Sequence, residues 1–222
     1  MQAALASWTG PGAQQTQLVR ERDALAARVH RLERELAELR GSEDISAGVT
    51  GQDRELVTAR VVGIAPVGTP VAARTVTIDA GREHGVRPAL TVVSGAGLVG
   101  RVLRVSEASS DVLLLGDADV VVGVRFGEEG ALGMVEARPA PGLPVRDAGE
   151  LTLTVVGDSP VTEGDEVVTL GSPDGRPYVA GVPLGTVTRV DPDSGQLNRT
   201  AVVEPHVDPD TLDLVAVVLG EG

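Results

Sequence analysis

The sequence contains no cysteine and no lysine, so arginine and histidine are its only basic residues. The absence of cysteine excludes a disulfide framework and thiolate metal sites. The absence of lysine excludes Schiff-base chemistry, a Ser–Lys dyad and a P-loop lysine. Aromatic residues are nearly as scarce, with one Trp, one Tyr and one Phe. Any core must therefore consist of Val, Leu, Ile and Ala, and the many valines favour strands because β-branched side chains fit a pleated surface.

Long apolar runs and excess positive charge are also missing. No stretch approaches the roughly 18 consecutive apolar residues of a membrane-spanning helix, and the first 15 residues lack the basic and apolar regions of a signal peptide. The net charge is −13, and only residues 16–41 carry about as many arginines as acids. An acidic body repels a phosphate backbone, and without aromatic platforms it has little to stack on bases or sugars. The composition excludes a nucleic-acid partner and disfavours a carbohydrate-binding module.

Residues 16–41 show a heptad repeat of apolar residues. The seam consists of Leu18, Leu25, Val29, Leu32, Leu36 and Leu39. This spacing predicts a coiled-coil helix that forms a homodimer, and Gly41 ends the helix. A leader at 1–15 precedes it and a polar hinge at 42–55 follows it. The alternative is an amphipathic helix that packs against its own domain.

From Leu56 onward, short Val-rich runs separated by turn residues predict a mainly β body. The expected strands are residues 57–64, 75–79, 90–93, 98–105, 111–115, 120–126, 131–136, 151–156, 166–170, 184–190, 199–203 and 214–218. Short antiparallel strands of this kind form barrels or sandwiches that protect their edges. Prolines near residue 140 interrupt pairing. We therefore predict two small antiparallel β-barrels, one at 56–143 and one at 144–222.

Two blocks of motif residues resemble a known family. The first contains a GREHGV turn, a GLVGRV strand and a hydrophobic strand that closes on Asp; the second contains GDEVVTLG followed by AGVPLGTV. The motif residues are Gly81, Gly85, Val86, Gly97, Leu98, Val99, Gly100, Arg101 and Asp117 in the first block, and Gly164, Asp165, Gly171, Gly181, Pro183 and Gly185 in the second. In this order the blocks resemble the rod-shape-determining protein MreC family.

The resemblance implies a helix followed by two β-barrels, acting as a non-enzymatic scaffold on the extracytoplasmic face of the bacterial cell membrane. Such a scaffold organises peptidoglycan synthases of the cell-elongation machinery. The implied partners are a class B penicillin-binding protein, MreD and other elongation proteins, with no cofactor and no small-molecule substrate. Family members normally carry an N-terminal membrane anchor, so residues 1–15 are expected to be the remainder of a truncated anchor region.

Two small β-barrels also occur in chymotrypsin-like proteases, so a secreted protease of this class is the alternative function. The chain contains the His, Asp, Ser order of that catalytic triad, in His84, then Asp111 or Asp117, and then Ser159. Pro160, however, removes a backbone N–H next to the serine that an oxyanion hole would need. We expect no catalytic residues.

The remaining candidates for chemistry have structural interpretations. The three histidines share no metal-ligand spacing. The acid pairs Asp117 with Asp119 and Asp191 with Asp193 are typical of solvated turns. The glycines at 95–100 are spaced like a dinucleotide fingerprint, but no helix is expected after them, so they predict a tight hairpin. We expect no metal site and no cofactor site.

Overall fold

The computed structural model describes residues 22, 25–29, 32, 54–64, 74–139, 145–192 and 198–221. The chain divides into two units, Met1–Arg40 and Gly41–Gly222. In the first unit the described residues are helical, and Leu25, Val29 and Leu32 are exposed.

The other predictions for the N-terminal region concern residues that are not described. Leu18, Leu36 and Leu39 lie outside the described residues, as does the leader at 1–15. The coiled coil and its homodimer therefore stay predictions. Of the predicted hinge at 42–55, only the last two residues are described, and these already belong to a strand.

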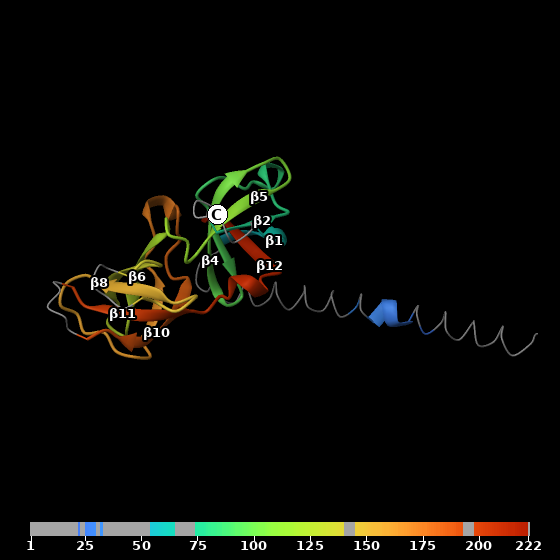
Figure 1. The fold of residues 1–222 in the computed structure, drawn as a ribbon. Coiled ribbons are helices and arrows are strands. Elements are labelled where there is room, and N and C mark those ends of the chain that lie inside the picture. Colours follow the sequence, from blue (N-terminus) through green and yellow to red (C-terminus); the bar gives the residue numbers. More distant parts are fainter. Residues whose placement is uncertain are drawn as a thin grey trace, which may run out of the picture. The chain divides into compact units, whose positions relative to one another are not determined.

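The first closed barrel of the second unit has six strands (Figure 1). Around the barrel their order is β1 (Arg54–Ile64), β12 (Leu214–Glu221), β3 (Thr91–Ser94), β4 (Gly97–Val105), β5 (Ser110–Leu114) and β2 (Thr75–Ile78). Neighbouring strands are antiparallel, and β2 pairs back to β1 to close the barrel. Closure leaves no free strand edge.

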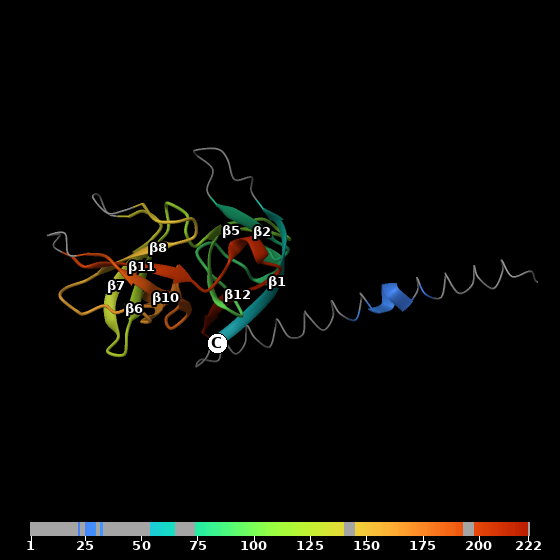
Figure 2. The same cartoon turned by 60° about the horizontal axis from the view of Figure 1, so that its bottom comes forward.

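The second closed barrel also has six antiparallel strands, with β6, β7 and β8 along one side (Figure 2). Their order is β10 (Pro183–Val190), β11 (Thr200–Pro205), β8 (Leu151–Val155), β7 (Ala131–Glu136), β6 (Val121–Phe126) and β9 (Glu166–Thr169). Three single-turn 3-10 helices, η1 (Arg82–His84), η2 (Pro173–Gly175) and η3 (Pro209–Thr211), lie in the connections. Each of the twelve expected strands overlaps a strand of the structure, so the prediction of a two-barrel, mainly β body is confirmed.

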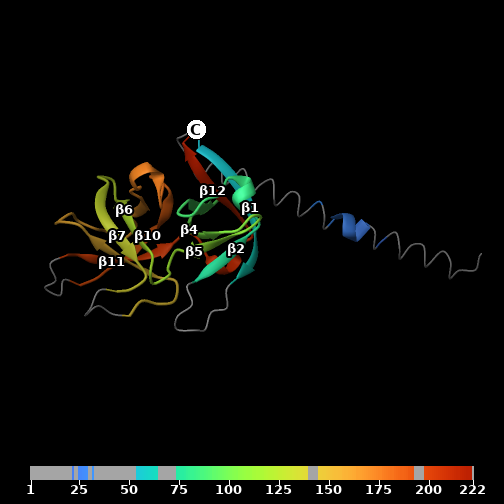
Figure 3. The same ribbon diagram turned by 90° about the horizontal axis from the view of Figure 1, so that it is seen from above.

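The two barrels do not follow one another along the chain. The chain leaves the first barrel after β5, builds the whole second barrel from β6 to β11, and returns to close the first with β12, which runs beside β1 in Figure 3. The predicted boundary between 143 and 144 is therefore wrong, because β7 and β8 on its two sides pair with each other in the second barrel. Prolines interrupt strand pairing inside a barrel as well as between barrels. The prolines near residue 140 therefore do not show where the chain passes from one barrel to the other.

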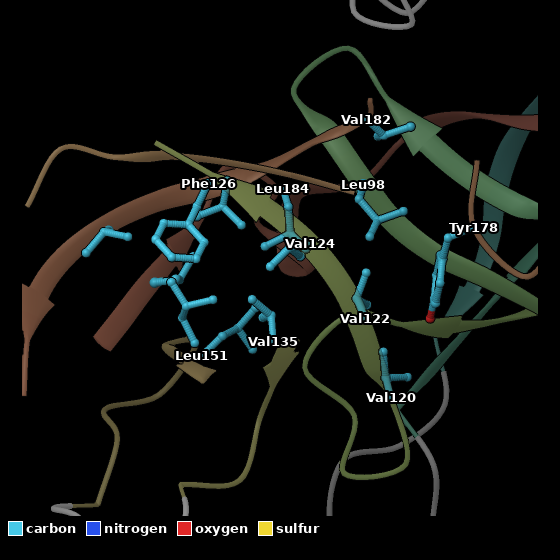
Figure 4. Packing of buried hydrophobic residues seen from close by; sticks show 14 of the residues in the cluster. Leu98, Val120, Val122, Val124, Phe126, Val135, Leu151, Tyr178, Val182 and Leu184 are labelled. Carbon is cyan, nitrogen blue, oxygen red and sulfur yellow. The ribbon is translucent and has the colours of Figure 1, made fainter. Parts of the chain in front are cut away.

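The barrel cores follow from the alternation of side chains along each strand. In β6, for example, Val122, Val124 and Phe126 are buried and the residues between them are not. One apolar cluster lies within the first barrel. The other fills the second barrel and also takes in Val93, Leu98 and other residues of the first (Figure 4). This second cluster, which we call the shared core, thus extends from one barrel into the other.

Candidate functional site

The barrels meet where the β3–β4 hairpin of the first barrel contacts residues 177–183 of the second. A Cβ atom at Gly97 would lie well inside 3.0 Å of the carbonyl oxygen of Pro183, and Gly97 has a φ of +143°. Glycine is therefore needed for the two backbones to approach this closely. Leu98, the next residue, lies in one apolar cluster with Tyr178 and Val182 (Figure 4). We call this contact, formed by Thr91, Gly97 and Leu98 with residues 169–183, the joint.

Two buried threonines, one from each barrel, hold the backbone of the joint. The Thr91 hydroxyl donates to the carbonyl oxygen of Pro177 (3.1 Å) and accepts from the N–H of Val179 (2.9 Å). The Thr169 hydroxyl donates to the carbonyl oxygen of Val179 (2.6 Å) and accepts from the N–H of Val182 (2.9 Å). Both threonines are almost fully buried. Their hydroxyls satisfy backbone groups that would otherwise be unpaired away from water.

Between these bonded groups, Tyr178 fills the shared core. Its side chain is buried. Burial raises the pKa of Tyr178, and the nearby Arg101 guanidinium only partly offsets this effect. The phenol is therefore neutral at physiological pH, and Tyr178 is a core residue.

Asp117 organises the segment through which the chain crosses from the first barrel to the second. Its Oδ2 accepts from the N–H of Arg74 (2.7 Å), and its Oδ1 accepts from the N–H of Asp119 (2.9 Å). Asp117 is buried whereas Asp119 is exposed. The expectation of a solvated turn acid is therefore wrong for Asp117, because backbone N–H groups rather than water surround its carboxylate.

Beside the joint lies a cleft of about 920 Å³ whose walls come from both barrels, with Leu98 and Gly116 on one side and Arg146 and Thr188 on the other. The Arg146 guanidinium contacts both carboxylate oxygens of Asp191, at 2.9 and 2.6 Å. Both side chains are only 3% exposed. This is a bidentate ion pair removed from water.

Hydroxyl groups complete the surroundings of this ion pair. Arg146 Nε donates to Thr152 Oγ1 (2.9 Å), and Thr200 Oγ1 donates to Asp191 Oδ2 (2.7 Å). The hydrogen bonds from Arg146, together with that from Thr200, hold the pKa of Asp191 below its usual value even though burial acts in the opposite direction. The expectation of a solvated turn acid is wrong for Asp191 too; Asp193 lies outside the described residues.

The structure brings together part of the predicted motif set. The joint contains Gly97 and Leu98 from the first barrel and Pro183 from the second. Gly171 and Gly181 lie in the part of the second barrel that forms the joint. Eight others lie within one barrel: Gly81, Gly85, Val86, Val99 and Gly100 in the first, and Gly164, Asp165 and Gly185 in the second. Arg101 lies on β4 of the first barrel but approaches Tyr178 of the second, and Asp117 lies in the segment that crosses between the barrels. At Gly100 and Gly185 a Cβ atom would collide with a carbonyl oxygen of the neighbouring strand, at Leu113 and Glu204 respectively. The glycines at 95–100 form the expected hairpin, because β3 and β4 pair through Ser94 and Gly97.

In the described part of the chain, the residues of the protease alternative do not form a catalytic arrangement. His84 Nδ1 accepts from the N–H of Gly81 (3.2 Å), and Asp111 pairs with Arg104 (2.9 Å). Among the residues that the structure describes, no hydrogen bond joins either of them to Ser159. The same residues contain no cluster of three or more potential metal ligands. No helix within the described ranges has the length and apolar character needed to cross a membrane.

Sequence reasoning missed the residues that hold the barrels together. Thr91 and Thr169 are buried residues of short strands otherwise rich in valine, and a threonine beside a valine pair is the one signal that could have identified them. Arg146 and Asp191 are 45 positions apart, in segments that gave no pairing signal.

Thr91→Val is expected to lower the free energy of unfolding by about 1–3 kcal/mol, because it keeps the shape of the side chain but leaves the carbonyl of Pro177 and the N–H of Val179 unpaired. Thr91→Ser keeps the hydroxyl and should lower the free energy of unfolding by less than Thr91→Val does. Urea denaturation of both variants tests this expectation. Equal losses would show that packing, and not the hydroxyl, holds the joint.

The fold and the joint define a double-barrel β protein in which the buried hydroxyl of Thr91 and the close backbone contact at Gly97 hold the two barrels together. The family model described as "Rod shape-determining protein MreC, barrel core" matches residues 71–219. The cell shape-determining protein MreC of Listeria monocytogenes is 30% identical over 198 residues, which cover 87% of this chain and 63% of that protein. The chain belongs to the MreC family, and the resemblance inferred from the motif blocks is confirmed.

Solved structures agree with this assignment. An MreC structure from Listeria monocytogenes matches with a TM-score of 0.65 and 27% identity, over 96% of this chain and 97% of that one. The MreC of Helicobacter pylori, solved in a complex with the penicillin-binding protein PBP2, matches with a TM-score of 0.51 and 16% identity, over 74% and 99%. At this identity the second match shows the fold alone. The chain spans less than two thirds of the length of the curated relatives that it matches.

Proposed function

We propose that this protein is a non-enzymatic scaffold of the bacterial cell-elongation machinery, which organises peptidoglycan synthases at the extracytoplasmic face of the cell membrane. Membership of the MreC family supports this role, since the relatives are named cell shape-determining proteins. Among the described residues, His84, Asp111 and Asp117 of the protease alternative are engaged in structural bonds, which favours the scaffold over the protease.

The single observation that carries the proposal is the joint. A scaffold must hold its binding surfaces in a fixed arrangement, and here Thr91 and Thr169 hydrogen-bond one loop from both barrels while Gly97 lets the backbones touch. A shared core continues from one barrel into the other. These contacts favour a single rigid body over two barrels on a flexible linker.

A class B penicillin-binding protein is the proposed main partner, with MreD and other elongation proteins as further ones. The complex of the Helicobacter pylori relative with PBP2 supports this choice. We also propose that the chain forms a homodimer through the N-terminal seam, where Leu25, Val29 and Leu32 are exposed and thus available to a second helix.

Calorimetry of the intact chain with the extracytoplasmic region of the cognate class B penicillin-binding protein is expected to give saturable binding. A class A penicillin-binding protein serves as the negative control, and Ser159→Ala should bind as the wild type does. If the folded chain binds neither protein, the proposed partner is wrong. Labelling of Ser159 by a fluorophosphonate, lost in Ser159→Ala, would instead favour the protease.

A further inference from the structure

The cleft beside the joint is lined by both passages of the chain from barrel to barrel. Leu115 and Gly116 belong to the passage that leaves the first barrel, and Val207 and Asp208 belong to the passage that returns to it. The volume of the cleft, about 920 Å³, falls within the range of small-molecule sites. The cleft is therefore large enough to take a short peptide.

Arg74 brings a half-buried cation into this cleft. Its backbone is fixed on both sides, because its N–H donates to Asp117 Oδ2 (2.7 Å) and its carbonyl oxygen accepts from the N–H of Leu114 (2.9 Å). Its guanidinium lies over Gly116: one terminal nitrogen is 3.4 Å from the position that a Cβ atom of Gly116 would occupy, and Leu151 Cδ2 is 3.7 Å from the same position. Among the described residues, this guanidinium has no ion-pair partner.

The surroundings of Arg74 favour a carboxylate that carries an apolar group. A guanidinium with available N–H groups can bind a carboxylate through two parallel hydrogen bonds. Apolar side chains from both barrels line the same cleft: Leu98, Leu115, Ala137, Val145 and Leu151. Val145 is 88% exposed, so a ligand can contact it directly. Arg146 also lines the cleft, but its guanidinium already holds Asp191, so it is not available to a ligand.

Four exposed carboxylates that make no ion pair with described residues also line the cleft. They belong to Asp147, Glu163, Glu204 and Asp208. These carboxylates repel a phosphate or any other ligand with several negative charges, whereas they attract an ammonium group. The cleft therefore suits a ligand that has one carboxylate for Arg74 and one ammonium group for the acids.

We propose that this cleft binds short free peptides in their zwitterionic form. The C-terminal carboxylate binds the guanidinium of Arg74, small apolar side chains contact the apolar walls, and the N-terminal ammonium group faces the carboxylates of Glu163 and Glu204. A fatty acid shares the carboxylate and the apolar part but lacks the cation, and a phosphate lacks both the apolar part and the cation. The charge pattern of the cleft therefore selects the peptide.

Trialanine is the probe, because it carries one carboxylate, one ammonium group and only small apolar side chains. Titration of the isotopically labelled full chain at low salt should produce saturable shifts of the amide resonances of Leu98, Gly116 and Val145, which line the cleft. A dissociation constant of about 1 mM is expected for a ligand of this size. Trialanine amide, which lacks the carboxylate, should bind about tenfold more weakly, and N-acetyl-trialanine, which lacks the ammonium group, about threefold more weakly.

Variants of the chain identify the residues that read the two charges of the peptide. Arg74→Gln should weaken trialanine about tenfold and abolish the preference for the free acid over the amide, because the cation that distinguishes them is gone. Arg87→Gln removes an exposed arginine of the first barrel that does not line the cleft; it is the matched control and should leave binding unchanged. Glu163→Gln combined with Glu204→Gln should weaken trialanine about threefold but should not weaken N-acetyl-trialanine, which has no ammonium group.

The proposal is overturned if trialanine at about ten times the expected dissociation constant causes no saturable shift at the residues that line the cleft, if the amide binds as tightly as the free acid, or if Arg87→Gln has the same effect as Arg74→Gln. Equal binding of N-acetyl-trialanine would overturn it too, because the cleft would then accept the C-terminus of any chain rather than a free peptide. None of these outcomes bears on the scaffold proposal, which is measured through the binding of a penicillin-binding protein.

Discussion

Arg146→Leu is expected to lower the free energy of unfolding by about 3–5 kcal/mol, because it leaves the carboxylate of Asp191 buried without its cation. The side chains of both residues are 3% exposed, so solvent does not screen the loss. Thr200 still donates one hydrogen bond to Asp191, but a hydroxyl does not neutralise a charge. Urea denaturation followed by far-ultraviolet circular dichroism gives the change directly.

Two further variants separate the ion pair from simple loss of volume. Arg189→Leu removes a cation whose side chain is 53% exposed in its 3.6 Å pair with Glu150, and it should cost less than about 1 kcal/mol. The double variant Arg146→Leu with Asp191→Leu should recover much of the loss, because the uncompensated buried charge is gone. If Arg146→Leu lowers the free energy of unfolding no more than Arg189→Leu does, the buried ion pair contributes no more to stability than an exposed one.

The same pair predicts how stability depends on pH. The pKa of Asp191 is lower in the folded chain than its ordinary value. Its contribution to stability is therefore fully present above the unfolded-state pKa of about 3.9, and it is lost as the pH falls through the lower pKa of the folded state. In Arg146→Leu, burial without the cation instead raises the pKa of Asp191. The difference in stability between the wild type and Arg146→Leu should therefore be constant near neutral pH and begin to shrink once the pH is low enough to protonate Asp191 in the folded variant.

The strands could be predicted from the sequence because each one is a local pattern. Alternating burial in β6, for instance, places Val122, Val124 and Phe126 inward, and the pattern needs no knowledge of the partner strand. The allocation of strands to barrels is different. It depends on β12 returning to pair with β1 across most of the chain, and no local feature of either strand specifies that pairing.

The residues of the candidate site also divide into those that local sequence motifs predict and those that only the fold brings together. The motif resemblance identified Gly97 and Pro183, which do meet at the joint. It did not identify Thr91, whose hydroxyl bonds to groups 86 and 88 positions away, because a threonine in a strand is unremarkable until its partners are known. The position of Asp191 after a strand predicts a turn acid, and only the fold places Arg146 against it.

Gly97→Ala is expected to destabilise the chain by about 2–4 kcal/mol, because it combines a steric collision with backbone strain. The new Cβ atom would lie well inside 3.0 Å of the carbonyl oxygen of Pro183, and backbone atoms cannot rotate away as a flexible side chain can. The β3–β4 hairpin and the loop before β10 must therefore separate. The opening should expose the N–H of Val179, which in the wild type donates to Thr91 Oγ1.

Gly157→Ala is the matched control for this variant, since Gly157 also has a positive φ, +83°, but no heavy atom within 4 Å of a built Cβ. Gly157→Ala should lower the free energy of unfolding by only about 1–2 kcal/mol, from backbone strain, and should leave the joint closed. Hydrogen exchange of the amides at Val179 and Val182 distinguishes the two: exchange should accelerate in Gly97→Ala and stay slow in Gly157→Ala. If both variants lose the same stability and protect these amides equally, the close approach at Gly97 does not hold the barrels together, and the joint depends on its hydrogen bonds and shared core alone.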